Sequence, residues 1–252
     1  MTRARGKNTG PPGQLPSLPR RPARLALAVI EALTDQIVSG QFPAGSQLPP
    51  EPTLCEIFGV SRITVREAVK SLEEKGLVLA RQGSGTTVTE QDGWTLLDPI
   101  VLAAVVRHDS QLTLLDQLVD VRARLEAPMA AQAARNASAT DIAEIAALLA
   151  LLDSQVEEQG SFLETDVAFH DRIMRASANR LSRSIVRTVH AEARKSYRYS
   201  GAPTSTECRV TNDEHRAVFE CIRNRDEAGA EQSMAQHILS AWERRRPTHR
   251  SD

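Results

Sequence analysis

The stretch that most constrains the fold of this chain is Val60–Gly76, with the sequence VSRITVREAVKSLEEKG. Its apolar residues recur at spacings of three and four, which predicts a helix with one buried face. That face is expected to consist of Ile63, Val65, Val69, Leu72 and Leu77. Ser61 stands where an N-cap is needed, and Gly76 stands where a helix commonly ends in a left-handed residue.

The exposed face of this helix is predicted to begin with Arg62, Thr64 and Arg66. Guanidinium groups suit guanine edges and phosphates, so this face is suited to the major groove of DNA. An ordinary surface helix with a serine cap explains the same residues equally well. The neighbouring segments therefore have to decide between the two interpretations.

Two helices are expected before this stretch. Ala23–Ser39 is amphipathic, with a predicted buried face of Leu27, Ile30, Ala32, Leu33 and Ile37. Pro50–Gly59 is a shorter helix, expected to turn Leu54 and Ile57 inward. Two short helices joined by a glycine turn, behind a supporting helix, are typical of a helix-turn-helix.

A β-hairpin is predicted directly after Gly76. The runs Leu77–Arg81 and Thr86–Thr89 are rich in β-forming residues and flank the glycine-rich segment Gln82–Gly85. A glycine-rich tip allows close approach to a nucleic-acid backbone. Helices followed by such a hairpin predict a winged helix-turn-helix.

The run at residues 47–88, QLPPEPTLCEIFGVSRITVREAVKSLEEKGLVLARQGSGTTV, resembles the DNA-binding domain of the GntR family of bacterial transcription regulators, and the resemblance covers residues 25–89. The resemblance implies that Arg62 and Arg66 contact bases or phosphates and that Ser61 and Thr64 lie at the DNA backbone. It also implies that the tip at Gly83 and Gly85 enters the minor groove. The family usually has Ser-Glu-Arg where this chain has Pro50-Glu51-Pro52. An arginine contact with DNA is therefore missing there, and we expect weaker operator binding or an operator of different sequence.

Charge and composition divide the chain. Residues 1–90 carry 11 Lys and Arg against 8 Asp and Glu, whereas residues 91–252 carry 20 against 24, so a basic front precedes an acidic body. A basic front suggests a polyanionic partner. We expect a disordered basic tail at 1–21, the winged helix-turn-helix at 22–90, a linker at 91–98 and an all-helical domain at 99–246.

The second half is expected to be an antiparallel helical bundle, which makes the chain mostly α. Breakers and caps delimit the predicted helices Pro99–Arg107, Thr113–Asn136, Ala139–Gln159, Phe162–Ala178, Arg180–Tyr199, Thr206–Arg223 and Asp226–Arg245. Ile142–Leu152 is apolar on nearly all sides, which predicts a helix buried inside the bundle.

The protein is expected to be cytoplasmic. Cys55, Cys208 and Cys221 are an odd number without framework spacing, which predicts free thiols in a reducing compartment. No apolar run approaches the about 20 residues of a membrane span, and the N-terminus lacks the apolar core of a secretory signal.

A metal site is predicted inside the helical half. Asp166 and His170 are four residues apart, so they share one helical face, and His215 and His237 lie beside the apolar stripes of two further helices. One carboxylate and three imidazoles from three helices suit a divalent transition metal, with positions left for water or ligand. Three unrelated core histidines are the alternative explanation.

The motifs VRARLE, DVAFH, ASAN, DEH and MAQHI, in this order over residues 100–245, resemble the FCD domain of the FadR subgroup of GntR regulators. That resemblance implies that Asp166, His170, His215 and His237 hold zinc, nickel or a similar ion. It also implies that Arg122 binds an effector carboxylate, although an ion pair with Glu126 is equally compatible. Asn179 is a further effector-binding candidate, with helix capping as its alternative role.

The predicted function is a transcription regulator, in the family's commoner form a repressor, and not an enzyme. A homodimer would bind a palindromic double-stranded operator, under the control of a small carboxylate or sugar acid at the metal site. A metal-dependent hydrolase or lyase fused to a DNA-binding head, and a pure metal sensor, are the alternatives. Glu214 could be proposed as the general base that the enzyme hypothesis needs. It is expected to point away from the metal because it adjoins His215.

Overall fold

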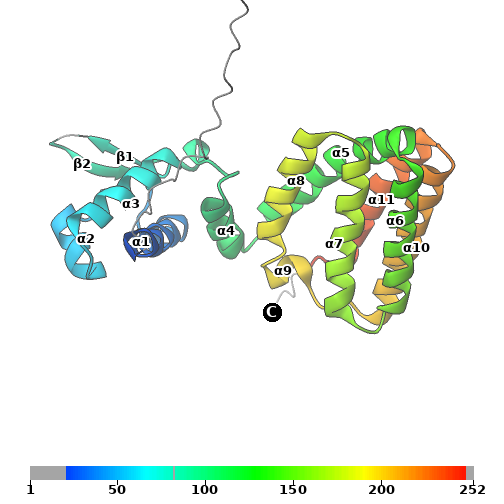
Figure 1. Cartoon of the computed structure of the whole chain (residues 1–252). Coiled ribbons are helices and arrows are strands. Elements are labelled where there is room, and N and C mark those ends of the chain that lie inside the picture. The colour runs from blue at the N-terminus through cyan, green and yellow to red at the C-terminus, as the bar shows by residue number, and fades with distance from the viewer. Residues whose placement is uncertain (1–20, 82, 248–252) are drawn as a thin grey trace, which may run out of the picture.

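The fold is mostly α-helical, as predicted, with one small hairpin in the N-terminal part (Figure 1). The computed structural model describes residues 21–81 and 83–247. The predicted basic tail, 1–21, lies outside these residues except for Arg21, the first residue of α1. The elements are α1 Arg21–Val38, α2 Glu51–Phe58, α3 Arg62–Glu74, β1 Val78–Arg81, β2 Gly85–Val88, η1 Gln91–Gly93, α4 Pro99–His108, α5 Thr113–Asn136, α6 Ala139–Ser154, α7 Gln159–Ala176, α8 Arg180–Ala193, α9 Tyr197–Ser200, α10 Ser205–Arg223 and α11 Glu227–Arg245.

The elements α1 to β2 form a winged helix-turn-helix head. The Ser61 side chain caps α3 by accepting a hydrogen bond from the Thr64 amide, and Gly76 has a φ of +75°, both as the sequence predicts. A Cβ at Gly76 would also meet the Gly93 carbonyl, so only glycine fits there. β1 and β2 pair antiparallel, with Val78 opposite Val88 and Arg81 opposite Gly85.

Four side chains of the head differ from their predicted exposure. The buried face of α3 is Thr64, Val65, Ala68 and Leu72, which leaves Ile63 70% exposed and removes Thr64 from the predicted exposed face. The Thr64 hydroxyl lies 2.9 Å from Ser61 Oγ, inside the cap. Leu27 and Ile57 are exposed as well. Leu27 lies about 100° around α1 from the buried Ala26, so it faces away from the core. Ile57 is exposed because α2 packs mainly on α3, and α3 covers only one side of α2.

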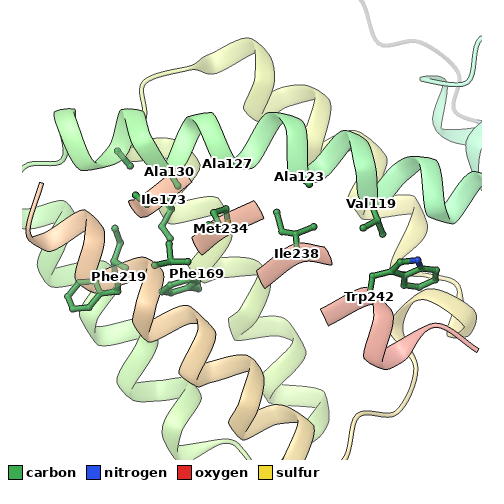
Figure 2. Packing of buried hydrophobic residues seen from close by; sticks show 14 of the residues in the cluster. Val119, Ala123, Ala127, Ala130, Phe169, Ile173, Phe219, Met234, Ile238 and Trp242 are labelled. Atoms are coloured by element: carbon green, nitrogen blue, oxygen red, sulfur yellow. The ribbon is translucent and has the colours of Figure 1, made fainter. Parts of the chain in front are cut away.

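The elements α5 to α11 form the helical bundle around one large apolar core, with a smaller buried cluster of Met129, Met174 and Val186. Long α5 runs beside α11 and also packs on α7, α8 and α10. Small residues of α5, among them Ala123, Ala127 and Ala130, face Met234 and Ile238 of α11 (Figure 2). Small side chains let two helix backbones approach closely, which brings α7, α10 and α11 within reach of one another.

Helix α6 corrects the prediction of a fully buried Ile142–Leu152. Only Ile145, Leu149 and Leu152 of that segment are buried, and Leu151 is 44% exposed. Because α6 packs on α7 and α10 from outside, one side of it stays uncovered. An apolar composition therefore does not place a helix at the bundle centre.

Helix α4 lies between the head and the bundle and belongs to both cores (Figure 1). Val101 is fully buried in the core of the head, whereas Leu102 and Val106 are buried in the core of the bundle. Asp98 caps α4 and also accepts a hydrogen bond of 2.5 Å from Lys75, the residue that ends α3. No helix in the described ranges has the length and apolarity needed to cross a membrane.

Candidate metal centre and DNA-binding surface

The four predicted metal ligands converge in the middle of the bundle. Asp166 and His170 come from α7, His215 from α10 and His237 from α11, and one ligand atom of each lies within 4.8 Å of the others. Nε2 of His237 is 3.1 Å from Nε2 of both His170 and His215, and Nε2 of His215 is 3.3 Å from Asp166 Oδ1. All three imidazoles are buried, whereas Asp166 is partly exposed.

Two glutamates fix two of the imidazoles from behind. His170 Nδ1 lies 2.7 Å from Glu126 Oε2, and His237 Nδ1 lies 2.9 Å from Glu214 Oε2. An ionised carboxylate accepts a hydrogen bond from the Nδ1–H group, so the lone pair of each imidazole is left on Nε2, the atom that faces the cluster. These glutamates are arranged as the outer partners of metal-binding histidines commonly are.

Each glutamate is in turn held by an arginine. Arg122 Nε donates to Glu126 Oε1 at 2.6 Å, and Arg122 Nη1 donates to the Tyr199 hydroxyl at 2.6 Å. Arg244 donates to both oxygens of Glu214 at 2.7 Å. The prediction that Glu214 points away from the site therefore needs correction, because it reaches His237 on the neighbouring helix. Both of its oxygens are engaged, which leaves it poorly placed as a general base.

The pKa values favour the forms that bind metal. Burial, together with the nearby His215, lowers the pKa of His237 to about 3, and burial also lowers the pKa of His215. Burial opposes ionisation of Asp166, but the adjacent His215 and His170 imidazoles outweigh it and hold the Asp166 pKa well below its usual range. Neutral imidazoles and an ionised carboxylate are the forms that coordinate cations.

The donor set fits a divalent metal. Zinc–nitrogen bonds of about 2.0–2.1 Å place the corners of a tetrahedron about 3.3 Å apart. Three of the six separations between the ligand atoms are 3.1–3.3 Å, and all four atoms lie within 4.8 Å of one another. Both Nε2–Nε2 pairs lie at hydrogen-bonding distance, so either a proton or a cation has to lie between their lone pairs. The four residues can therefore hold a metal ion, and the partly exposed Asp166 marks the side from which ligand would enter.

The remaining predicted effector residues have other partners. Arg122 is buried and pairs with Glu126, the alternative that its sequence spacing left open. Asn179 caps α8 by accepting from the Ser182 amide. The roles of Glu126 and Glu214 leave no signal in the sequence beyond their spacing from Arg122 and His215.

The DNA-binding candidates lie on α3 and on the hairpin of the head. Arg62 and Arg66 are exposed on α3, and Arg66 Nε pairs with Glu51 at 3.0 Å. Ser61 and the hairpin residues Gly83 and Gly85 are exposed too. Ile63, which was expected in the core, is exposed on α3 as well. Together they present guanidinium donors and an apolar side chain on a helix of the size that fits a major groove.

Two family models match the chain. Residues 25–88 match "Bacterial regulatory proteins, gntR family", and residues 117–240 match "FCD domain". The galactonate operon transcriptional repressor of Escherichia coli K12 is 29% identical over 216 residues, or 86% of this chain and 94% of that protein. The transcriptional regulator YieP of the same strain is 31% identical, covering 80% and 87%. The regulator LutR of Bacillus subtilis is 30% identical, covering 81% and 93%.

Solved structures share the fold. A Listeria monocytogenes protein, Lar, described as controlling the agr system, has a TM-score of 0.56 at 16% identity, covering 92% of this chain and 98% of its own. Streptococcus agalactiae GntR has a TM-score of 0.50 at 23% identity, covering 87% and 99%.

A winged head joined to a helical bundle with an internal ligand site defines a two-domain transcription regulator. The chain belongs to the GntR family of bacterial regulators, in the subgroup that carries an FCD domain.

Proposed function

We propose that this regulator binds a palindromic operator as a homodimer and that a small organic acid, bound at a metal ion in the FCD domain, controls that binding. The observation that carries the proposal is the convergence of Asp166 and three histidine Nε2 atoms inside the bundle. Repression is the expected mode, since relatives include the galactonate operon repressor and NanR repressors.

The head supplies the DNA contacts. Arg62 and Arg66 are placed to reach guanine edges or phosphates, Ile63 offers an apolar contact for a thymine methyl group, and the Gly83–Gly85 tip can approach the minor groove. One head covers few base pairs, and a two-fold dimer doubles the contacts.

Zinc or nickel is the expected metal. Three imidazole nitrogens and one carboxylate oxygen suit either ion, and hard oxygen-seeking ions such as magnesium are poorly served by this set. The metal would supply a positive centre for an oxygen of the acid. The chain would orient the imidazoles through Glu126 and Glu214.

Helix α4 offers a route from the bundle to the DNA. It packs on α8, buries residues in both cores, and is joined to the end of α3 through Asp98 and Lys75. An acid that binds one arrangement of the bundle more tightly would shift the position of the heads, with a coupling of typically about 1–3 kcal/mol.

The test is thermal unfolding of metal-loaded and chelator-stripped protein with a panel of carboxylates and sugar acids. A ligand of the folded state raises the midpoint. The proposal predicts a rise with metal, and a further rise with one acid that disappears after stripping. No response to stripping or to any acid would make the histidines structural. A rise with metal alone, together with release of DNA by metal alone, would favour a metal sensor.

A further inference from the structure

A cavity of about 210 Å³ opens beside the candidate metal centre, between α7, α8, α9 and α11. Asp166 forms part of its wall, so the open side of the four-residue cluster faces this space. Its polar lining also includes Glu164, His190, Arg194, Tyr199 and Arg245. The volume lies below the about 300–1,000 Å³ typical of sites for drug-sized ligands, which suits a small ligand.

Two guanidinium groups in the cavity wall stand out from the other arginines of the bundle. Most of those others are paired with carboxylates, as Arg122, Arg183 and Arg244 are. In the described part of the chain, neither Arg194 nor Arg245 has a carboxylate within ion-pair distance. Arg245 Nε donates to the Ala241 carbonyl of its own helix. Their remaining N–H groups therefore suit an anion brought by a ligand.

Arg122 cannot take this role without losing its buried partners. Its Nη1 instead holds the Tyr199 hydroxyl, and the Tyr199 ring stacks on Trp242 with centroids 5.7 Å apart. Because the Tyr199 oxygen accepts from Arg122, its own proton is free to be donated to a ligand in the cavity. Arg122 thus positions one wall of the cavity.

We infer that Arg194 and Arg245 form a second anchor, which binds the carboxylate of a sugar acid whose hydroxyl groups reach the metal centre at Asp166. This inference rests on the proposed function and specifies its ligand. Glu164, exposed at the rim, accepts hydrogen bonds from hydroxyls but repels a second carboxylate. The cavity therefore favours a polyhydroxy monocarboxylate over a dicarboxylate of the same length, and it favours either of these over acetate, which is too short to span both anchors.

The test uses full-length, zinc-loaded protein and the variants Arg194→Gln and Arg245→Gln. Calorimetric titration with gluconate, galactonate, succinate and acetate measures binding, and a chromogenic chelator measures zinc occupancy. Arg175→Gln is the matched control, since Arg175 is an exposed arginine of α7 outside the cavity lining. Loss of a charge-assisted hydrogen bond should weaken sugar-acid binding by about 10–100-fold in either cavity variant, with zinc occupancy unchanged. Arg194→Lys should recover part of the affinity.

Three results would overturn the inference: equal sugar-acid binding in wild type and both cavity variants, tighter binding of succinate than of either sugar acid, or no binding of any acid to zinc-loaded wild type. In each case, full zinc occupancy would leave the metal centre intact. Failure of the wild type to bind zinc would instead contradict the proposed function itself.

Discussion

The DNA-binding head and the helical bundle differ in the exposure of their functionally important charged residues. In the head, Arg66 is paired with Glu51, yet its side chain is 71% exposed, and Arg62 is exposed beside it. In the bundle, Arg122 and Glu126 are 6% and 0% exposed and belong to a chain of contacts that ends at His170. The charges of the head can therefore be removed without harming the fold, whereas the inner charges of the bundle serve fold and ligand site together.

The largest effect is expected from Glu126→Ala. It leaves Arg122 buried without its carboxylate, which should lower the free energy of unfolding by about 3–5 kcal/mol. Urea unfolding of the metal-free protein measures this. Glu74→Ala, which removes an exposed pair with Lys70, is the control and should stay within about 0.5 kcal/mol of wild type. Equal free energies of unfolding for both variants would contradict the claim that the buried charges of the bundle matter more for stability than the exposed charges of the head.

Arg62→Ala and Arg66→Ala should each weaken operator binding by about 10–100-fold, because each removes a forked donor to a base or phosphate. Fluorescence anisotropy on a duplex selected from random DNA measures the affinity, and urea unfolding should show unchanged stability. Arg124→Ala, on the bundle surface, is the control. Full affinity in both α3 variants would refute the assignment of the recognition helix.

Glu214→Gln tests the outer partners of the metal centre. Weaker orientation of the His237 ring should reduce zinc affinity by about 10–100-fold while the fold is retained. Competition with a chromogenic chelator gives the affinity. Glu220→Gln, on the same helix but in a surface pair with Arg223, should bind zinc as wild type does. Wild-type affinity in the Glu214 variant would mean that this contact serves structure alone.

Acid should destabilise the metal-free protein before its carboxylates titrate. The His237 pKa is about 3 in the fold against an ordinary 6.5, so the unfolded chain takes up a proton that the folded chain refuses. Stability is therefore full above about pH 6.5 and is lost as the pH falls towards 3, with a slope of up to about 1.4 kcal/mol per pH unit for this group. Urea unfolding at pH 7.5, 6 and 5 measures it. His237→Gln should flatten the profile, and a flat wild-type profile would contradict the pKa assignment.

The smallest effect is expected where the two regions meet. Asp35 of α1 accepts from Arg107 and His108 of α4 at 2.9 and 3.0 Å. Asp35→Asn removes an exposed pair, so stability should change by less than about 1 kcal/mol. The influence of a bound acid on operator affinity should change by about 0.5–2 kcal/mol, measured by anisotropy with and without the acid. If the bound acid changes operator affinity equally in wild type and the Asp35 variant, this contact does not take part in the coupling between the bundle and the head.

The same contrast explains what the sequence alone could predict. The caps and exposed arginines of α3 lie within one continuous stretch, and the wing follows it directly, so local patterns sufficed. The positions of Ile63 and Thr64 were wrong because an apolar period of three to four tolerates a rotation of the helix, and only packing on α1 decides it.

In the bundle, the sequence predicted that the four candidate metal ligands would converge, and the structure brings them together. The prediction was possible because these residues lie beside the apolar stripes of their helices. It did not predict that Glu214 reaches His237 or that Arg122 is enclosed by Glu126 and Tyr199. These contacts join helices far apart in the chain, and their partners follow from tertiary packing. Likewise, the sequence did not predict that Arg194 and Arg245 line one cavity, because tertiary packing brings them together.

The claim that a metal centre in the bundle controls the head is tested most directly by operator affinity in four conditions: zinc-loaded or chelator-stripped protein, with or without the acid that gives the largest thermal shift. The account predicts that the acid changes operator affinity at least about 5-fold in zinc-loaded protein and has no effect after stripping. The same change in stripped protein, or no change in either, would contradict it.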